Sequence, residues 1–72
     1  MAFLSEVELS DMNFASLGSN VLISSRASIY NPDRITIGDN SRIDDFCLLS
    51  GKIEIGRNVH FAAYSNIAGG DE

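Results

Sequence analysis

Large apolar residues recur at every sixth position through most of this 72-residue chain. Nine of them form the series, which is interrupted once by two extra residues: Leu17, Ile23, Ile29, Ile37, Ile43, Leu49, Ile55, Phe61 and Ile67. The residue two places before each is uncharged and small or aliphatic, from Ala15 to Ser65. A period of six fits neither an α-helix nor a long alternating strand. The spacing therefore predicts a short strand followed by a turn, repeated along the chain.

Three six-residue units make a turn of eighteen residues, and the sequence repeats itself at that interval. The stretch "IGDN", 37–40, returns as "IGRN", 55–58, and "LGSN", 17–20, precedes them. The two extra residues lie in "YNPDR", 30–34, which is typical of a corner loop. The aligned glycines and asparagines suit the left-handed backbone conformation of tight corners. We therefore expect three stacked coils with three flat faces, each coil packing only on its neighbours.

The two ends of the repeat differ. Residues 1–14 are predicted to form an N-terminal cap with a short helix, and residues 15–72 the repeat. Ser5 with Glu8 three positions later is a capping box, and such a helix shields the open end of a coil stack. The last stretch, "IAGGDE", carries no comparable cover. We expect the chain to be the N-terminal part of a longer protein, truncated at its C-terminal end, or to pair there with another copy.

Charge and cysteine content narrow the possible partners. Five basic and ten acidic residues give a net charge of −5 and a pI of about 4.5, which opposes binding to nucleic acid or to an anionic membrane. No apolar run is long enough to insert across a bilayer, and the first ten residues lack the pattern of a signal peptide. A lone cysteine, Cys47, indicates a reducing compartment, so we expect a cytoplasmic protein. One histidine and one cysteine cannot close a zinc site, so no metal is expected.

The units "LGSNVL", "IGDNSR" and "IGRNVH" resemble those of the hexapeptide-repeat acyltransferases. The resemblance covers residues 15–72 and implies an all-β fold, the left-handed parallel β-helix. The stretches "SLGSNVLISSRASIYNP" and "VHFAAYSNIAGG" are more narrowly similar to bacterial sugar O-acetyltransferases of polysaccharide biosynthesis. That likeness implies a homotrimer with active sites between subunits and acetyl-CoA, or another acyl-CoA, as cosubstrate. It implies acyl transfer to a sugar hydroxyl or amine, with a histidine as general base.

The candidate catalytic residue is His60, the only imidazole in the chain. It follows the inward Val59, so its side chain is expected to point outward, in one column with Leu22 and Arg42. Many members of the family carry their histidine in the region after Ile67, where this chain has glycines. His60 therefore has two open interpretations, a catalytic residue or a solvated surface residue.

Two other groups of residues are interpreted as structural. Asp44 and Asp45 are adjacent, so their side chains point to opposite sides of a strand. We expect a solvated corner there rather than a pair for acid–base chemistry. Cys47 falls in the small inward column, which predicts a buried thiol rather than a nucleophile.

Phe46, Leu48 and Tyr64 gather on the outside of one predicted face. Exposed apolar clusters usually mark contacts, and we expect the homotrimer to form through this face. A sugar-binding cleft is the alternative, since aromatic rings suit the apolar faces of sugars, and it makes Tyr64 and Asn66 candidate substrate-binding residues.

Two rival functions share the predicted fold. A non-catalytic β-helix, serving as a scaffold or oligomerisation module, agrees with the low histidine content. A relative of the γ-class carbonic anhydrases would need three metal-binding histidines across an interface. A single His60 is a poor match to that requirement.

Overall fold

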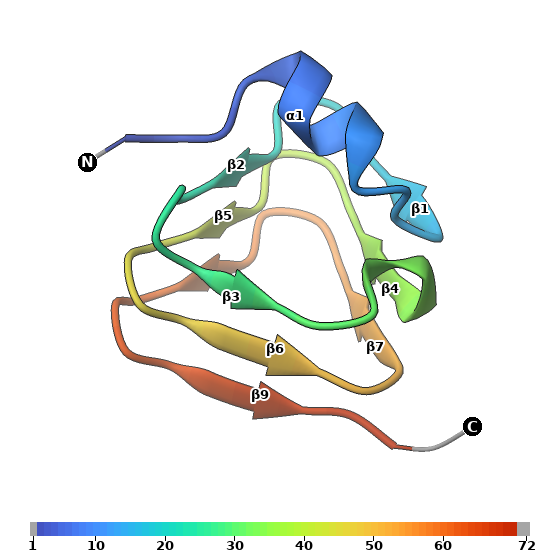
Figure 1. The fold of residues 1–72 in the computed structure, drawn as a ribbon, viewed down its shortest axis with the longest axis vertical. Coiled ribbons are helices and arrows are strands. Elements are labelled where there is room, and N and C mark those ends of the chain that lie inside the picture. Colours follow the sequence, from blue (N-terminus) through green and yellow to red (C-terminus); the bar gives the residue numbers. More distant parts are fainter. Residues whose placement is uncertain (1, 71–72) are drawn as a thin grey trace.

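The computed structural model describes residues 2–70, which wind into three stacked coils (Figure 1). Each coil contributes one short strand to each of three sheets, so neighbours within a sheet lie three strands apart in sequence. The first sheet contains β1 (Ser16–Leu17), β4 (Ile35–Ile37) and β7 (Ile53–Ile55). The second contains β2 (Leu22–Ile23), β5 (Arg42–Ile43) and β8 (His60–Phe61). The third contains β3 (Ser28–Ile29), β6 (Leu48–Ser50) and β9 (Asn66–Ala68).

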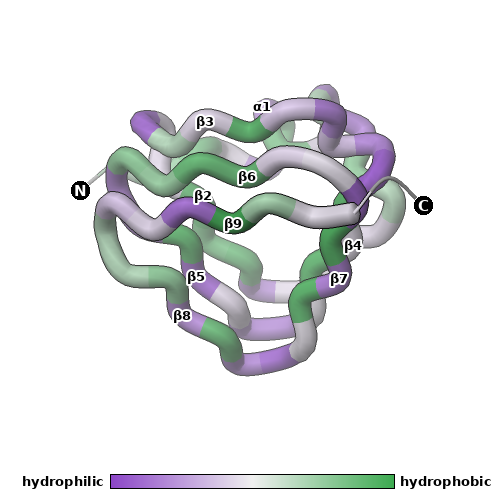
Figure 2. The backbone as a smooth tube through the Cα atoms, turned by 90° about the horizontal axis from the view of Figure 1, so that it is seen from below, coloured by the Kyte–Doolittle hydropathy of each residue, from purple (hydrophilic) through white to green (hydrophobic). Residues whose placement is uncertain are grey.

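All strand pairs are parallel, and their register confirms the predicted columns. The three apolar columns pair residue by residue: Leu17 with Ile37 and Ile55, Ile23 with Ile43 and Phe61, and Ile29 with Leu49 and Ile67. Apolar residues of this size suit such short strands, because each side chain packs on another large apolar side chain one coil above or below. Figure 2 shows hydrophobic and hydrophilic segments following each other along the coils, as inward and outward residues alternate.

The core lies along the axis of the coils and is densest in the middle one. Ile37, Ile43 and Leu49 of that coil are at most 1% exposed. Their equivalents in the third coil, Phe61 and Ile67, are only partly buried, because one side of that coil has no neighbour among the described residues. Cys47 is buried, as predicted, with its Sγ 3.1 Å from the carbonyl oxygen of Ala62. Most of the apolar burial therefore comes from coil stacking.

The backbone conformation at the corners explains why the repeat keeps a regular spacing along the chain. Asn20, Asn40 and Asn58 have φ values of 59°, 62° and 59°, so the predicted left-handed corners are confirmed at the asparagines. The prediction is wrong for the aligned glycines, because Gly18, Gly38 and Gly56 do not have positive φ. The two extra residues are accommodated by a three-residue 3₁₀ turn, Pro32–Arg34, which follows a left-handed Asn31 at φ 54°. Phe46 and Tyr64 also adopt positive φ, at 62° and 67°, which the sequence did not predict.

The N-terminal segment lies across the first coil (Figure 1). Its helix α1 (Glu6–Asp11) begins with the predicted capping box: Glu8 N donates to Ser5 Oγ at 3.1 Å, and Ser5 N donates to Glu8 Oε1 at 2.8 Å. Leu9 is the buried residue of this helix. Before the helix, Leu4 N donates to the carbonyl oxygen of Ile23 at 2.8 Å, which pairs the outer edge of β2. Within residues 2–70 no helix is long and apolar enough to cross a membrane.

Two equivalent glycines give a matched test of coil stacking. A Cβ on Gly38 would lie 2.7 Å from the carbonyl carbon of Gly56 and 2.8 Å from Arg57 N, whereas a Cβ on Gly56 meets nothing within 4 Å. We expect Gly38→Ala to lower the free energy of unfolding of this chain by about 1–3 kcal/mol, because backbone must move. Gly56→Ala should change it by less than about 0.5 kcal/mol. Urea titrations of both variants measure the difference, and equal midpoints would contradict the stacking distance.

Candidate active site

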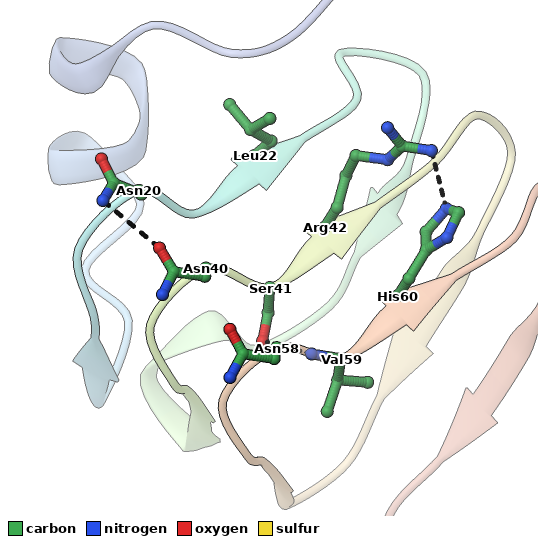
Figure 3. A pocket seen from close by; sticks show the side chains of 8 residues that line it. All are labelled: Asn20, Leu22, Asn40, Ser41, Arg42, Asn58, Val59 and His60. Carbon is green, nitrogen blue, oxygen red and sulfur yellow. Dashed lines mark hydrogen bonds between the residues drawn. The ribbon is translucent and has the colours of Figure 1, made fainter.

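The outer surface of the second sheet carries the candidate catalytic histidine. Leu22, Arg42 and His60 lie in register on β2, β5 and β8, which confirms the predicted outward column. A shallow pocket of about 340 Å³ lies over this column, and the corner asparagines form its other border (Figure 3). Asn20 Nδ2 donates to Asn40 Oδ1 at 3.3 Å along that border. The pocket thus combines amide groups with one imidazole and one guanidinium.

A buried carboxylate joins the histidine and the arginine. Asp44 is 7% exposed, and its Oδ2 lies 2.7 Å from His60 Nε2. Arg42 Nε lies 2.9 Å from Asp44 Oδ1, and Arg42 Nη2 lies 3.0 Å from His60 Nε2. The hydrogen bond from His60 is the main reason that the pKa of Asp44 is lowered, and Arg42 adds to it while burial opposes it. Asp44 is therefore ionised near neutral pH.

The expectation of a solvated corner at Asp44 is wrong. Asp44 follows Arg42 by two residues, so both side chains leave the same side of the chain, and His60 lies beside Arg42 in the next coil. These two neighbours cover the carboxylate. Asp45 lies in the turn after β5 and is not part of this cluster, since it accepts a hydrogen bond from Ser24 Oγ. The i, i+2 spacing combined with the coil register is a signal that could have placed the three residues near one another, although it does not fix the burial of Asp44.

The candidate substrate-binding residues lie at the next corner rather than in this pocket. Tyr64 is 77% exposed and stacks on Phe46, with ring centroids 5.2 Å apart and an angle of 17° between the planes. The Arg26 guanidinium carbon lies 5.9 Å from the Phe46 centroid. Asn66 is exposed at the start of β9, opposite the half-buried Leu48. The structure therefore brings the aromatic residues together on one corner, with Asn66 and Leu48 on the adjoining sheet.

The described residues hold no group of three histidine, cysteine or acidic side chains placed to bind a metal ion. The residues at the second sheet can support proton transfer by an imidazole that is hydrogen-bonded to an ionised carboxylate. Such a pair suits a reaction in which a nucleophile loses a proton.

Comparison with protein families matches residues 34–69 to the bacterial transferase hexapeptide family (six repeats). Among characterised proteins, a dTDP-4-amino-4,6-dideoxy-D-glucose acyltransferase from Escherichia coli is 51% identical over 72 residues. That match covers 96% of this chain and 38% of the relative. The chain therefore spans well under half the length of the relative it matches.

Solved structures give the same likeness. AntD, an N-acyltransferase from Bacillus cereus in complex with dTDP and 3-hydroxybutyryl-CoA, is 58% identical with a TM-score of 0.94, covering 97% of this chain and 38% of that one. A point variant of AntD in complex with dTDP-4-amino-4,6-dideoxyglucose and coenzyme A is 58% identical with a TM-score of 0.88, covering 90% and 35%. The likeness confirms the predicted fold class, a left-handed parallel β-helix with a short N-terminal helix.

Proposed function

Because the chain belongs to the bacterial transferase hexapeptide family, we propose that it forms the first three coils of a longer coenzyme A-dependent acyltransferase. The reaction proposed is transfer of an acyl group from its coenzyme A thioester to the amine of a sugar carried on dTDP. The observation that carries this proposal is the identity of 51% and 58% to amino-sugar acyltransferases over nearly the whole chain. Those relatives favour an amine over the hydroxyl that the sequence left as an alternative.

The division of the chain is part of the proposal. Residues 1–14 are proposed to be the cap of the first coil, and residues 15–72 the repeat. Further coils are proposed to stack on β7, β8 and β9, since the relatives are much longer than this chain. The coenzyme A groove is proposed to draw on those later coils.

His60 is proposed as the general base of the transfer. Its partner Asp44 is buried and ionised, and the side chain of His60 is itself half exposed, at 50%, so a reactant has access to the ring. Tyr64 and Asn66 are proposed to contact the sugar or its nucleotide from the neighbouring corner. Both residues are exposed, which binding of a ligand requires.

The assembly proposed is a homotrimer that forms through Phe46, Leu48 and Tyr64. Phe46 is 46% exposed, and both aromatic residues hold a positive φ that costs energy for a bulky side chain. A stacked aromatic pair presented at such a cost suits a contact surface. We propose a cytoplasmic location, where acyl-CoA and nucleotide sugars occur, and a role in building polysaccharide.

Phe46→Glu tests the interface. We expect this variant to convert the trimer to monomers, because a charge would be buried between subunits without a partner. Sedimentation velocity measures the change, and Val7→Glu is the control, since Val7 is 70% exposed on α1. A trimer that persists in Phe46→Glu at the same concentration would place the interface elsewhere.

Calorimetric titration tests the enzyme proposal against the scaffold alternative. The longer protein is titrated with coenzyme A and, separately, with a dTDP-linked 4-amino sugar. We expect saturable binding of both ligands at one site per chain. A non-catalytic scaffold would bind neither, and that outcome would overturn the proposed function.

A further inference from the structure

We propose that Asp44 is a positioning residue, which holds neutral His60 with its proton on Nε2 and so makes Nδ1 the nitrogen that accepts a proton. The catalytic consequence rests on the proposed function, whereas the tautomer is a property of this chain alone. The argument comes from the contacts around one ring nitrogen.

His60 Nε2 lies near two groups with opposite hydrogen-bonding roles, one an acceptor and one a donor. Asp44 Oδ2 lies 2.7 Å away, and Arg42 Nη2 lies 3.0 Å away (Figure 3 marks the second contact). An ionised carboxylate only accepts hydrogen bonds, and a guanidinium only donates them. In neutral histidine Nε2 is either a donor or an acceptor, so it hydrogen-bonds with one of these neighbours and not with both.

Nε2 donates its hydrogen bond to the Asp44 carboxylate rather than accepting one from Arg42. Either hydrogen bond would involve one charged partner, but the contact with the carboxylate is the shorter one, at 2.7 Å against 3.0 Å. An Nε2 lone pair would instead face the negative charge of a side chain that is 7% exposed and poorly screened by water. Arg42 has another acceptor, since its Nη2 donates to Asp44 Oδ2 at 3.4 Å and its Nε lies 2.9 Å from Oδ1 in the same ion pair. The proton therefore lies on Nε2, between the ring and Asp44.

This arrangement fixes both the ring and its reactive atom. Asp44 is held from the other side by Arg42, so it cannot follow His60 if the ring rotates. Within the described residues, Nδ1 of His60 has no hydrogen-bond partner, and the side chain is half exposed. Nδ1 is then the basic nitrogen available to a reactant. A carboxylate that orients an imidazole in this way also stabilises the cation formed when the ring takes up a proton.

In the proposed reaction, the acceptor amine nitrogen forms a bond to the acyl carbon of the thioester. The bond between that carbon and sulfur breaks, and coenzyme A leaves as the thiolate. The proton lost by the nitrogen moves to Nδ1 of His60, and it passes afterwards to the thiolate. Asp44 touches neither substrate and keeps its charge throughout.

The tautomer can be measured directly, because His60 is the only histidine in the chain. Protein labelled with ¹⁵N-histidine gives two ring nitrogen signals whose shifts separate a protonated from an unprotonated nitrogen. Above the pH at which the ring becomes neutral, we expect Nε2 to be protonated and Nδ1 unprotonated. If the wild-type spectrum shows mainly the opposite tautomer, or an equal mixture of the two, that spectrum alone overturns the proposal.

Variants separate positioning from mere stability. Asp44→Asn removes the charge that selects the tautomer, so we expect a mixture of the two forms in its spectrum. Glu54→Gln is the matched control, because Glu54 is exposed on β7 and loses the same charge. Its spectrum should equal that of the wild type. An Asp44→Asn spectrum that retains the single wild-type tautomer would overturn the assignment.

Kinetics of the longer enzyme complete the test. We expect Asp44→Asn to lower kcat by roughly 10–100-fold or more with KM for acyl-CoA unchanged, because the base is misoriented while the donor still binds. An unchanged kcat would overturn the positioning role. Absence of transfer by the wild type would instead overturn the proposed function and leave the measured tautomer intact.

Discussion

Ile43→Ala is expected to lower the free energy of unfolding by about 2–5 kcal/mol. Ile43 is 0% exposed and sits between Ile23 above and Phe61 below, so truncation leaves a cavity that three coils share. For a 72-residue chain this loss is a large part of the total stability, which is about 0.05–0.15 kcal/mol per residue. Urea unfolding followed by circular dichroism measures it.

Ile67→Ala is the matched control for that result. Ile67 loses the same atoms but is only partly buried in the third coil of this chain. Its truncation should therefore cost clearly less than that of Ile43. Equal losses at the two positions would mean that the outer coil is covered in solution, for example by a second copy of the chain.

His60→Ala is expected to lower kcat of the longer enzyme by about 10²–10⁴-fold, which is the usual contribution of general acid–base catalysis. The reason is the loss of the only imidazole in this part of the protein. A stopped assay of amide product, with saturating donor and acceptor, gives kcat. Glu54→Ala is the control, because Glu54 is exposed on the first sheet, away from the pocket beside His60. Full activity of His60→Ala would remove His60 from the catalytic machinery.

The coils were predictable because the hexad pattern fixes which residues point inward. Once Leu17, Ile37 and Ile55 are aligned, strand register and corner positions follow, since a one-residue slip would place polar residues in the core. The asparagine corners were also predictable, because asparagine tolerates the left-handed conformation better than most residues. Local sequence and long-range packing agree at these positions.

The burial of Asp44 did not follow from the pattern. Alternation places Asp44 outside, which is correct, but it does not say whether outward side chains from adjacent coils lie over one another. Parallel strands are about 4.8 Å apart, so a long arginine and an imidazole can close over a short carboxylate between them. The contact depends on rotamers rather than on which face a residue occupies.

The aromatic corner was predictable in composition and not in geometry. The sequence places Phe46 and Tyr64 outside one face, and both are exposed. Their left-handed backbone was unexpected, because bulky residues rarely adopt it. Each occupies the second position of its turn, as Asn40 and Asn58 do at the preceding corner. The geometry of the coil therefore overrides the residue preference there.

The most direct test of the central proposal is a transfer assay on the longer protein. Release of coenzyme A thiol is followed with an acyl-CoA donor and either a dTDP-linked 4-amino sugar or the matching sugar with a hydroxyl at that carbon. We predict thiol release with the amine, together with an amide product of the expected mass, and little release with the hydroxyl. Release that does not depend on the amino sugar, or no release with either acceptor, would contradict the assignment.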